Sequence, residues 1–313
     1  MKLTRRHLAI IALIINSIIW GAAAPIFKWT LQDVPPFTLA FLRFLFAALI
    51  LLPFVFHKIT VHYKHFHKLF LLAFIGIFIH IGTLFVGLQF ASSINVPIIS
   101  AVSPIIMILG SFFYLHEKPR MKVIVGTLLS LAGVLFIVIQ PVITHGPDQS
   151  LFGNLLFVAS MIAMVIYTLL LKKFNLPYPA ATIIFWIFLF GALMFAPFFY
   201  IEQQTAFTLS SFDFKAIIGI FYGAVLSSIV AYLLYDYGVT YMTGSEIGIF
   251  GYLEPIVTIL VAMPLLGEVL SFEYLVGSIF VFAGIIIAEG RLRHHHLHHH
   301  HLTKKALLTP KDV

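Results

Sequence analysis

Seven side chains within the apolar stretches of this sequence have the chemistry to bind a small polar or amphipathic molecule. They are Trp20, His80, Ser100, Ser103, Tyr235, Tyr252 and Glu254. The carboxylate and the imidazole can bind protons or charged groups, the hydroxyls and the indole N–H form hydrogen bonds, and the rings offer stacking surfaces. Ionisable groups are costly inside a membrane segment and are therefore candidates for a functional site by default. We predict that these residues line a substrate-binding site.

Glu254 is the most informative of the seven, because it is the single charged residue in the run GIFGYLEPIVTILVAMPLL, residues 248–266. Pro255 follows it directly and interrupts the hydrogen-bond ladder of a helix there, since proline has no backbone N–H. Carbonyl groups that lose their partner in this way can accept hydrogen bonds from water or from a substrate. We therefore expect a polar break in an otherwise apolar helix.

Several of the polar residues also have a purely structural interpretation. His80 could be a buried histidine that hydrogen-bonds a neighbouring helix. Lys28 lies near the end of its apolar segment, where its ammonium can extend to the lipid headgroups, and Arg43 is expected to pair with a carboxylate or with headgroups. Most aromatic side chains must face lipid or pack between helices, so Trp20 and Tyr235 do not by themselves indicate an aromatic ligand.

Composition predicts the elements that must hold these residues. Of the 313 residues, 61% are hydrophobic and 10% are charged, and the mean hydropathy is +1.04. A soluble domain is nearer half apolar and a quarter charged. The apolar residues occur in runs of about 18 or more, which is typical of membrane-spanning helices. We predict an all-α polytopic membrane protein with ten transmembrane helices, at roughly 8–30, 36–56, 68–89, 92–115, 121–141, 152–172, 179–201, 215–236, 244–266 and 272–289.

The first of these segments also resembles a secretory signal. The stretch MKLTRRHLAIIALIINSIIWGAAA has a basic start, an apolar middle and small residues at its end. However, Pro25 would directly follow the small residues, and the apolar run continues through Ile26 and Phe27. We therefore expect an uncleaved first helix.

Lysine and arginine are distributed unevenly between the connections of the predicted helices. With the N-terminus in the cytoplasm, alternation through ten helices places 16 of the 19 basic residues in cytoplasmic segments, the exceptions being Lys28, Arg43 and Lys215. Because positive charge stays on the cytoplasmic side, we predict a multi-pass protein of the cytoplasmic (inner) membrane with both termini in the cytoplasm. Contact with the lipid bilayer then accounts for the net charge of +7, and no nucleic acid is needed to explain it.

The sequence repeats itself after about half its length. A shift of 151 residues aligns SSINVPIISAVSPIIMILGSFFYLHE with TGSEIGIFGYLEPIVTILVAMPLLGE. Pro104 then meets Pro255, and Glu117 meets Glu268. For both glutamates we expect a structural role, either capping the next helix or tying a gate region.

The repeat predicts two units, at residues 1–145 and 150–290, followed by a His-rich basic cytoplasmic tail at 291–313. Each unit contains five predicted helices, and an odd number of helices inverts the second unit in the membrane. Two inverted repeats are the architecture of many secondary transporters, in which the substrate site lies between the halves near the midplane.

Several short motifs, taken in order, resemble one known family. They are WGAAAPIFKW in the first helix, FLRFLFAALILLP in the second, INVPIISAVSPIIMILGSFFYLHEKP in the fourth, and EP followed by LLGE in the ninth. The chain resembles the EamA-type transporters of the drug/metabolite transporter superfamily, with two EamA repeats covering nearly all of it apart from the tail. The resemblance implies a ten-helix carrier with a central cavity, commonly an exporter of amino acids or related metabolites, and does not specify the substrate.

Histidine-rich segments raise the question of metal binding. The tail has seven histidines within positions 294–301, and the stretch 57–68 has four more. Imidazole is a common ligand of zinc and nickel, but no apolar segment carries the clustered His and Asp residues expected of a metal pathway. We predict no metal site and no cofactor, and a metal transporter is the least favoured alternative.

Two classes of function remain. The first is a secondary transporter that exports amino acids or related small metabolites by alternating access, with proton coupling through Glu254 or His80 as a sub-hypothesis and uniport as its alternative. The second is a non-transporting membrane protein, either an intramembrane enzyme or a lipid-binding partner. An enzyme needs several catalytic side chains at one depth, whereas the candidates here are scattered over different helices. We therefore predict no enzymatic activity.

Overall fold

The elements of the described chain are all helical. The structure, a computed structural model, describes residues 4–103, 105–106, 121–145, 149–205, 213–241 and 250–289. The part of the chain before residue 146 forms α1 (Arg5–Thr30), α2 (Pro36–Val55), η1 (Phe56–Lys58), η2 (Tyr63–His65), α3 (Phe66–Ala73), η3 (Phe74–Ile79), α4 (His80–Phe90), α5 (Asn95–Ser100) and α7 (Met121–His145). The rest forms α8 (Gln149–Phe174), α9 (Ala180–Thr205), α10 (Phe214–Phe221), η5 (Tyr222–Val230), α11 (Ala231–Tyr241), α13 (Leu253–Leu266) and α14 (Phe272–Glu289).

Membrane-spanning helices account for most of this structure. Within the described residues, six helical segments are long and apolar enough to cross a membrane, namely Arg5–Thr30, Pro36–Lys58, Tyr63–Phe90, Gln149–Leu171, Ala180–Gln204 and Phe214–Tyr235. Three shorter apolar helices, Ile124–Ile139, Leu253–Leu266 and Phe272–Ile287, coincide with further predicted segments. Of the predicted helix at 92–115, the first half contains α5 (Asn95–Ser100) and residues 107–115 lie outside the described residues. The all-α membrane fold is therefore confirmed, and the total of ten spans stays a prediction.

Local signals in the sequence explain several helix ends. Thr4 caps α1, and its hydroxyl accepts a hydrogen bond from the backbone N–H of His7 at 3.3 Å. Asp213 caps α10 in the same manner, accepting from Ala216 N at 2.9 Å. Such caps satisfy the N–H groups that lack a partner in the first turn. At the other end of α13, Gly267 adopts the left-handed conformation with φ of +67°, which glycine reaches without steric cost.

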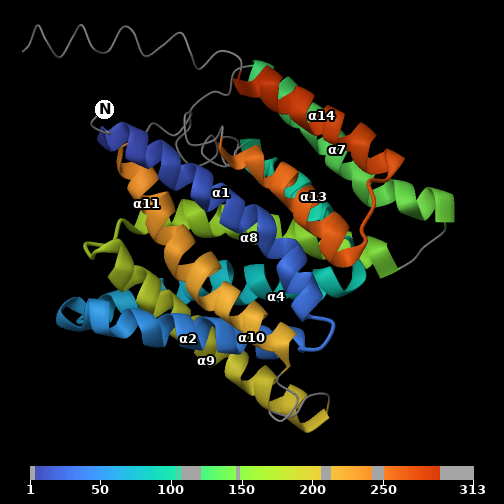
Figure 1. Cartoon of the computed structure of the whole chain (residues 1–313). Helices are drawn as coiled ribbons and strands as arrows, with labels where there is room; N and C mark the ends of the chain where they lie inside the picture. Colours follow the sequence, from blue (N-terminus) through green and yellow to red (C-terminus); the bar gives the residue numbers. More distant parts are fainter. Residues whose placement is uncertain are drawn as a thin grey trace, which may run out of the picture.

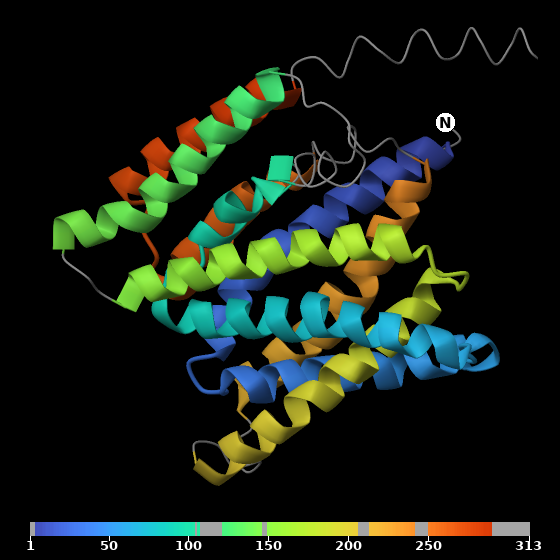
Figure 2. The same cartoon turned by 180° about the vertical axis from the view of Figure 1, so that it is seen from behind.

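Helices from the two halves of the chain pack on one another to form the bundle. α1 lies against α13 and α11, α2 against α9, α4 against α8, and α7 against α14. Figure 2 shows α4 beside α8 and α7 beside α14 from behind. Each of these pairs joins one helix from before residue 146 to one from after it, so the core lies between the halves. Figure 1 also shows the N-terminal end of α1 and the C-terminal end of α14 toward the same end of the bundle.

Backbones approach closely where α7 crosses α14. A Cβ atom added at Gly133 would lie 2.6 Å from the carbonyl oxygen of Gly277, and one added at Gly284 would overlap the carbonyl oxygen of Gly126. Small residues allow membrane helices to pack at this distance, where dispersion contacts stabilise the pair. The two helices are antiparallel at these contacts, since Gly126 and Gly133 of α7 meet Gly284 and Gly277 of α14 in the reverse order.

In the part of the chain that the structure describes, two segments are π-helical rather than α-helical. They are η3, which leads into α4, and η5, which leads into α11. Residues 79 and 230, at which the two segments end, are 151 positions apart, which is the offset of the sequence repeat. Because π-helical turns are rare and frequent at functional sites, these two segments are natural places to look for a binding site.

Candidate functional site

Arg43 lies at the centre of a polar cluster inside the bundle. It sits on α2 with 4% of its surface exposed. Its Nε donates a hydrogen bond to Ser228 Oγ at 3.0 Å and its Nη2 to Ser227 Oγ at 3.2 Å, and both serines belong to η5. The guanidinium carbon lies 4.8 Å from the ring centre of Phe27 and 4.9 Å from that of Phe44. The expected carboxylate or headgroup partner was therefore wrong within the described residues, where hydroxyls and aromatic rings surround the charge.

Trp20 and Tyr235, two of the predicted site residues, join this cluster. The indole Nε1 of Trp20 donates to the carbonyl oxygen of Ser227 at 3.2 Å. Its ring lies 5.4 Å from the Tyr235 ring and 5.5 Å, edge-on, from the Tyr232 ring. Ser227 thus connects the indole to the guanidinium. We call this set the Arg43 cluster; its members are Trp20, Arg43, Ser227, Ser228, Tyr232 and Tyr235.

The sequence interpretation missed the two serines of this cluster. Their one signal is an adjacent pair of hydroxyls in the middle of the apolar run GAVLSSIVAY. Hydroxyls in membrane helices commonly bond the carbonyl four residues back, so the pair alone predicts no partner. The partner, Arg43, lies 185 residues away in the sequence and is brought close only by the packing of α2 against η5.

Glu254 lies on α13 at the crossing with α1, directly beyond Trp20. A Cβ atom added at Gly21 would lie 2.8 Å from the Glu254 carbonyl oxygen, and Thr258 Oγ1 donates to the Gly21 carbonyl at 2.6 Å. Among the described residues no hydrogen bond or ion pair holds the Glu254 carboxyl, although the residue is partly buried. Gly21 directly follows Trp20 of the Arg43 cluster in α1. The structure therefore places this carboxyl beside the Arg43 cluster and leaves it available for a proton or a cation.

His80 is held by the neighbouring helix, as its structural interpretation predicted. Its Nδ1 lies 2.8 Å from Ser160 Oγ and 3.0 Å from the Ser160 carbonyl oxygen, and Ser160 Oγ donates to the His80 carbonyl at 2.9 Å. These bonds join the first residue of α4 to α8. No hydrogen bond or ring contact links His80 to the Arg43 cluster within the described chain.

The other three predicted residues lie apart from the cluster. Tyr252 packs edge-on against Phe282 of α14, with ring centres 5.9 Å apart. Ser100 closes α5 and Ser103 follows it, and α5 packs chiefly on α8. In the described part of the chain, no hydrogen bond or ring contact connects these residues to Trp20. A role for them in binding stays a prediction.

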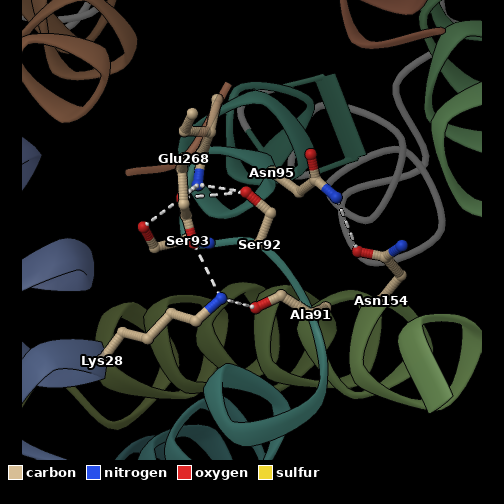
Figure 3. Close-up of polar contacts among 8 residues, drawn as sticks. Lys28, Ala91, Ser92, Ser93, Asn95, Asn154 and Glu268 are labelled. Carbon is tan, nitrogen blue, oxygen red and sulfur yellow. Dashed lines mark hydrogen bonds and ion pairs between the residues drawn. The ribbon is translucent and has the colours of Figure 1, made fainter. Parts of the chain in front are cut away.

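A second polar site lies at the C-terminal end of α1, shown in Figure 3. Lys28 Nζ forms an ion pair with Glu268 Oε1 at 2.7 Å and donates to the Ala91 carbonyl at 2.7 Å. Glu268 Oε2 accepts from the hydroxyls of Ser92 at 2.9 Å and Ser93 at 2.7 Å, and Oε1 accepts from Ser93 N at 2.9 Å. We call these five residues the Lys28–Glu268 junction. It ties three segments together: the end of α1, the loop before α5 and the loop before α14.

The junction favours the ionised form of Glu268. Burial alone would raise the pKa of the carboxyl, but the hydrogen bonds from Lys28 and Ser93 and the charge of Lys28 lower the pKa below its ordinary value. Lys28 was expected to extend toward headgroups and is instead paired, with 26% of its side chain exposed against 11% for Glu268. The structural role expected for Glu268 fits this arrangement. Its counterpart in the repeat, Glu117, lies outside the described residues.

Two hollows in the described chain lie away from the Arg43 cluster. A cavity of about 180 Å³ adjoins the junction, and its lining residues are Ser92, Ile94, Asn95, Ser150, Asn154, Val269, Ser271 and Tyr274. An apolar groove of about 510 Å³ runs over α1, α10 and α13, and its lining residues are Ile26, Trp29, Ile218, Leu260, Val261, Pro264 and Leu265. None of the seven predicted site residues lines either hollow.

Metal ligands do not gather in the part of the chain that the structure describes, where no group of three or more His, Cys, Asp or Glu residues could hold a metal ion. The histidines at 294–301 lie outside the described residues.

Comparison with known proteins identifies the family. The model of the EamA-like transporter family matches residues 7–139 and again residues 151–289. The chain belongs to the EamA-like transporter family. It is accordingly a multi-pass membrane protein of a transporter family, which supports a role other than catalysis.

Individual relatives of this EamA-like protein carry transporter names. The Uncharacterized transporter YetK of Bacillus subtilis (strain 168) is 28% identical, and the match covers 85% of this chain and 82% of YetK. An Uncharacterized transporter of Archaeoglobus fulgidus is 26% identical, and the match covers 89% of this chain and 96% of the relative. A solved crystal structure superposes with a TM-score of 0.62 over 96% of this chain and 99% of its own at 16% identity, which establishes likeness of fold alone.

Proposed function

We propose that this EamA-like protein is a secondary transporter that exports amino acids or related small metabolites across the cytoplasmic membrane by alternating access. The observation that carries the proposal is the Arg43 cluster. It places a buried cation, hydroxyls and aromatic rings between helices of the two halves, where an inverted-repeat carrier binds its substrate. The carboxyl of Glu254 adds the opposite sign of charge on a separate helix. Both signs of charge suit a substrate that is itself zwitterionic.

The proposal includes ten helices arranged as two inverted repeats, residues 1–145 and 150–290. Contacts that exchange under the repeat offset support it. Gly126 meets Gly284, and Gly133 meets Gly277. Residues 126 and 277 are 151 positions apart, as are residues 133 and 284, so the repeat offset converts each contact into the other. Such an exchange is expected when a two-fold axis in the membrane plane relates the halves.

Hydrogen bonds between the halves repeat in the same way. Ser130 Oγ donates to the carbonyl of Val281, exactly one repeat offset of 151 residues away, as expected for a contact on the axis itself. Ser160 Oγ donates to the carbonyl of His80 at 2.9 Å, and Asn16 Nδ2 donates to the carbonyl of Ala231, which is 151 residues beyond His80, also at 2.9 Å. The donors, Asn16 and Ser160, are 144 residues apart, so the two bonds correspond with a slightly shorter offset on the donor side. The bonds hold α8 to α4 and α1 to α11.

The orientation of the chain in the membrane follows from the distribution of lysine and arginine, which favours both termini in the cytoplasm. The position of both described chain ends toward one end of the bundle agrees with an even number of spans (Figure 1). In this orientation the Lys28–Glu268 junction lies at the outer face. We assign it the role of holding the outer side closed, because it joins α1 to loops from both halves. Proton coupling through Glu254 is part of the proposal.

Counterflow in proteoliposomes tests the proposal. Purified protein is reconstituted with one unlabelled compound inside, and uptake of the labelled compound is followed for a panel of amino acids and metabolites, with and without a pH gradient. Saturable uptake of at least one compound is expected. Folded protein that moves no member of the panel would refute the carrier and favour a non-transporting membrane protein.

A further inference from the structure

The charge of Arg43 is unusual because no carboxylate among the described residues forms an ion pair with it. The side chain is 4% exposed in the middle of α2, and no carboxylate of the described chain lies within ion-pair distance of it. A buried charge without a partner is costly in any protein interior and most of all inside a membrane. The two serine hydroxyls solvate the guanidinium only in part. An anion that joins Arg43 would recover much of that cost.

The geometry of Arg43 leaves room for such an anion in its hydrogen bonding. A guanidinium has five N–H donors in one plane. Ser228 takes the Nε donor and Ser227 takes one Nη2 donor, so three donors remain without a partner among the described residues. Phe27 and Phe44 pack on the guanidinium, which fixes its position. Free in-plane donors on a positioned guanidinium are suited to a carboxylate, which accepts two parallel hydrogen bonds.

The backbone next to Arg43 is also fitted to it. A Cβ atom added at Gly223 would lie 3.0 Å from both Cδ and Cγ of Arg43. This glycine belongs to η5, the π-helical segment that also carries Ser227 and Ser228. One short segment of the second half therefore makes space for the Arg43 stem and supplies both of its hydroxyl partners.

The charge balance of the cluster selects among anions. Lys28, a second basic side chain of the first half, is already paired with Glu268 at 2.7 Å. Arg43 therefore offers a single positive charge that no direct ion pair compensates. The nearby Glu254 adds no further positive charge. A monoanionic carboxylate matches one positive charge, whereas a phosphate monoester, with nearly two negative charges at neutral pH, would remain uncompensated.

We propose that Arg43 binds the carboxylate group of the transported substrate, while Trp20 and Tyr235 contact the body of the molecule. Trp20 is coupled to the same place because its indole bonds the Ser227 carbonyl, next to the hydroxyl that Arg43 uses. The substrate class is then small carboxylic acids, amino acids included, and excludes amines and neutral compounds that lack this group. The inference rests on the carrier function proposed above.

Matched ligands and matched variants test the carboxylate site. Wild-type protein in proteoliposomes is challenged with the common L-amino acids, with the corresponding amides and with the corresponding decarboxylated amines, as competitors of counterflow. The same compounds are tested for thermal stabilisation of the purified protein. Removing the carboxylate charge should weaken competition and binding by about 10- to 100-fold, as expected for loss of hydrogen bonds to a charged group.

Variants of the cluster separate binding from folding. Arg43→Lys keeps the charge but not the planar fork, and it should raise KM for carboxylates by about 10-fold or more with a smaller change in kcat. Ser228→Ala keeps the guanidinium and removes one orienting hydroxyl, and it should raise KM by a smaller factor. Lys215→Gln removes an exposed cation that pairs with Asp33 at 2.6 Å outside the cluster, and it serves as a control expected to leave KM unchanged.

The outcomes distinguish this inference from the carrier function. Wild type that moves amides or amines as well as the matching amino acids would overturn the carboxylate site and leave the carrier intact. An unchanged KM in folded Arg43→Lys would do the same. Stabilisation by carboxylates without any flux would keep the site and overturn the carrier, and neither stabilisation nor flux would overturn both.

Discussion

The Lys28–Glu268 junction gives the sharpest test of alternating access, through the variant Glu268→Gln. The glutamine keeps the size of the side chain and one of the two acceptor oxygens, either the one that accepts from Ser93 N or the one that accepts from the Ser92 and Ser93 hydroxyls. It removes the negative charge that Lys28 meets at 2.7 Å. If the junction holds the outer side closed, this substitution should favour the outward-open conformation.

The size of the effect follows from the exposure of the pair. A fully exposed ion pair contributes up to about 1 kcal/mol, whereas breaking a buried pair costs about 3–5 kcal/mol. The side chains of Lys28 and Glu268 are 26% and 11% exposed, so the pair lies between these limits. We expect a change of about 2 kcal/mol, which corresponds to about a 30-fold shift in the ratio of open to closed protein.

Spin labelling measures that ratio directly, because the chain has no cysteine to interfere. Labels at Gln89→Cys on α4 and Val269→Cys beside Glu268 sit on exposed positions on either side of the junction. Wild type should give mainly a short distance by pulsed electron resonance. In Glu268→Gln the ratio of the longer distance to the short one should rise by about 30-fold relative to wild type.

Glu202→Gln provides the matched control. Glu202 of α9 accepts hydrogen bonds from Thr38 N at 2.6 Å and from Phe37 N at 3.2 Å, so it caps α2 as Glu268 caps the loop before α5, but it has no cation partner in the described chain. This control should lower the melting temperature without changing the distance. Unaltered distances in Glu268→Gln, or the same change in Glu202→Gln, would refute the gating role.

Further predictions concern the carboxyl groups and the α1–α13 crossing. Glu254→Gln should reduce counterflow more than expression, and activity equal to wild type at every pH would refute proton coupling. Gly21→Ala forces a Cβ to within 2.8 Å of the Glu254 carbonyl and should cost about 1–3 kcal/mol, seen as a lower melting temperature, whereas Gly251→Ala has nothing within 4 Å and should be neutral. Because the pKa of Glu268 lies below its ordinary value of 4.5, its contribution to stability is complete above that pH and is lost as the pH falls through the lowered pKa. The difference in melting temperature between wild type and Glu268→Gln should therefore be constant at neutral pH and shrink in acid below about pH 4.5, and a constant difference there would contradict it.

The membrane helices could be predicted closely because each one is encoded locally. Runs such as residues 8–30 and 179–201 are apolar throughout, and the structure has α1 and α9 there. The positions of Trp20, His80 and Glu254 within helices were accessible for the same reason. Their partners were not, because a helix can rotate about its axis without any change in its own hydropathy.

Pairing errors illustrate this limit. The sequence alone suggested a carboxylate or headgroups for Arg43 and headgroups for Lys28, since both expectations depend only on the depth of the residue in its segment. The structure instead gives Arg43 two serines, 184 and 185 residues away, and gives Lys28 a glutamate 240 residues away. Each side chain had many polar candidates at such distances, and no local signal ranks them.

Hydropathy and charge distribution thus determined by themselves that this chain crosses a membrane many times, and the repeat predicted two related halves, because these properties sum over many residues and tolerate local error. The tertiary structure decided which faces of the helices meet. Close backbone contacts, such as Gly21 against Glu254, set the rotation and height of neighbouring helices. That packing brings Trp20 to Ser227 and leaves the charge of Arg43 without a carboxylate partner in the described part of the chain. Both features arise from contacts between halves that no stretch of sequence contains.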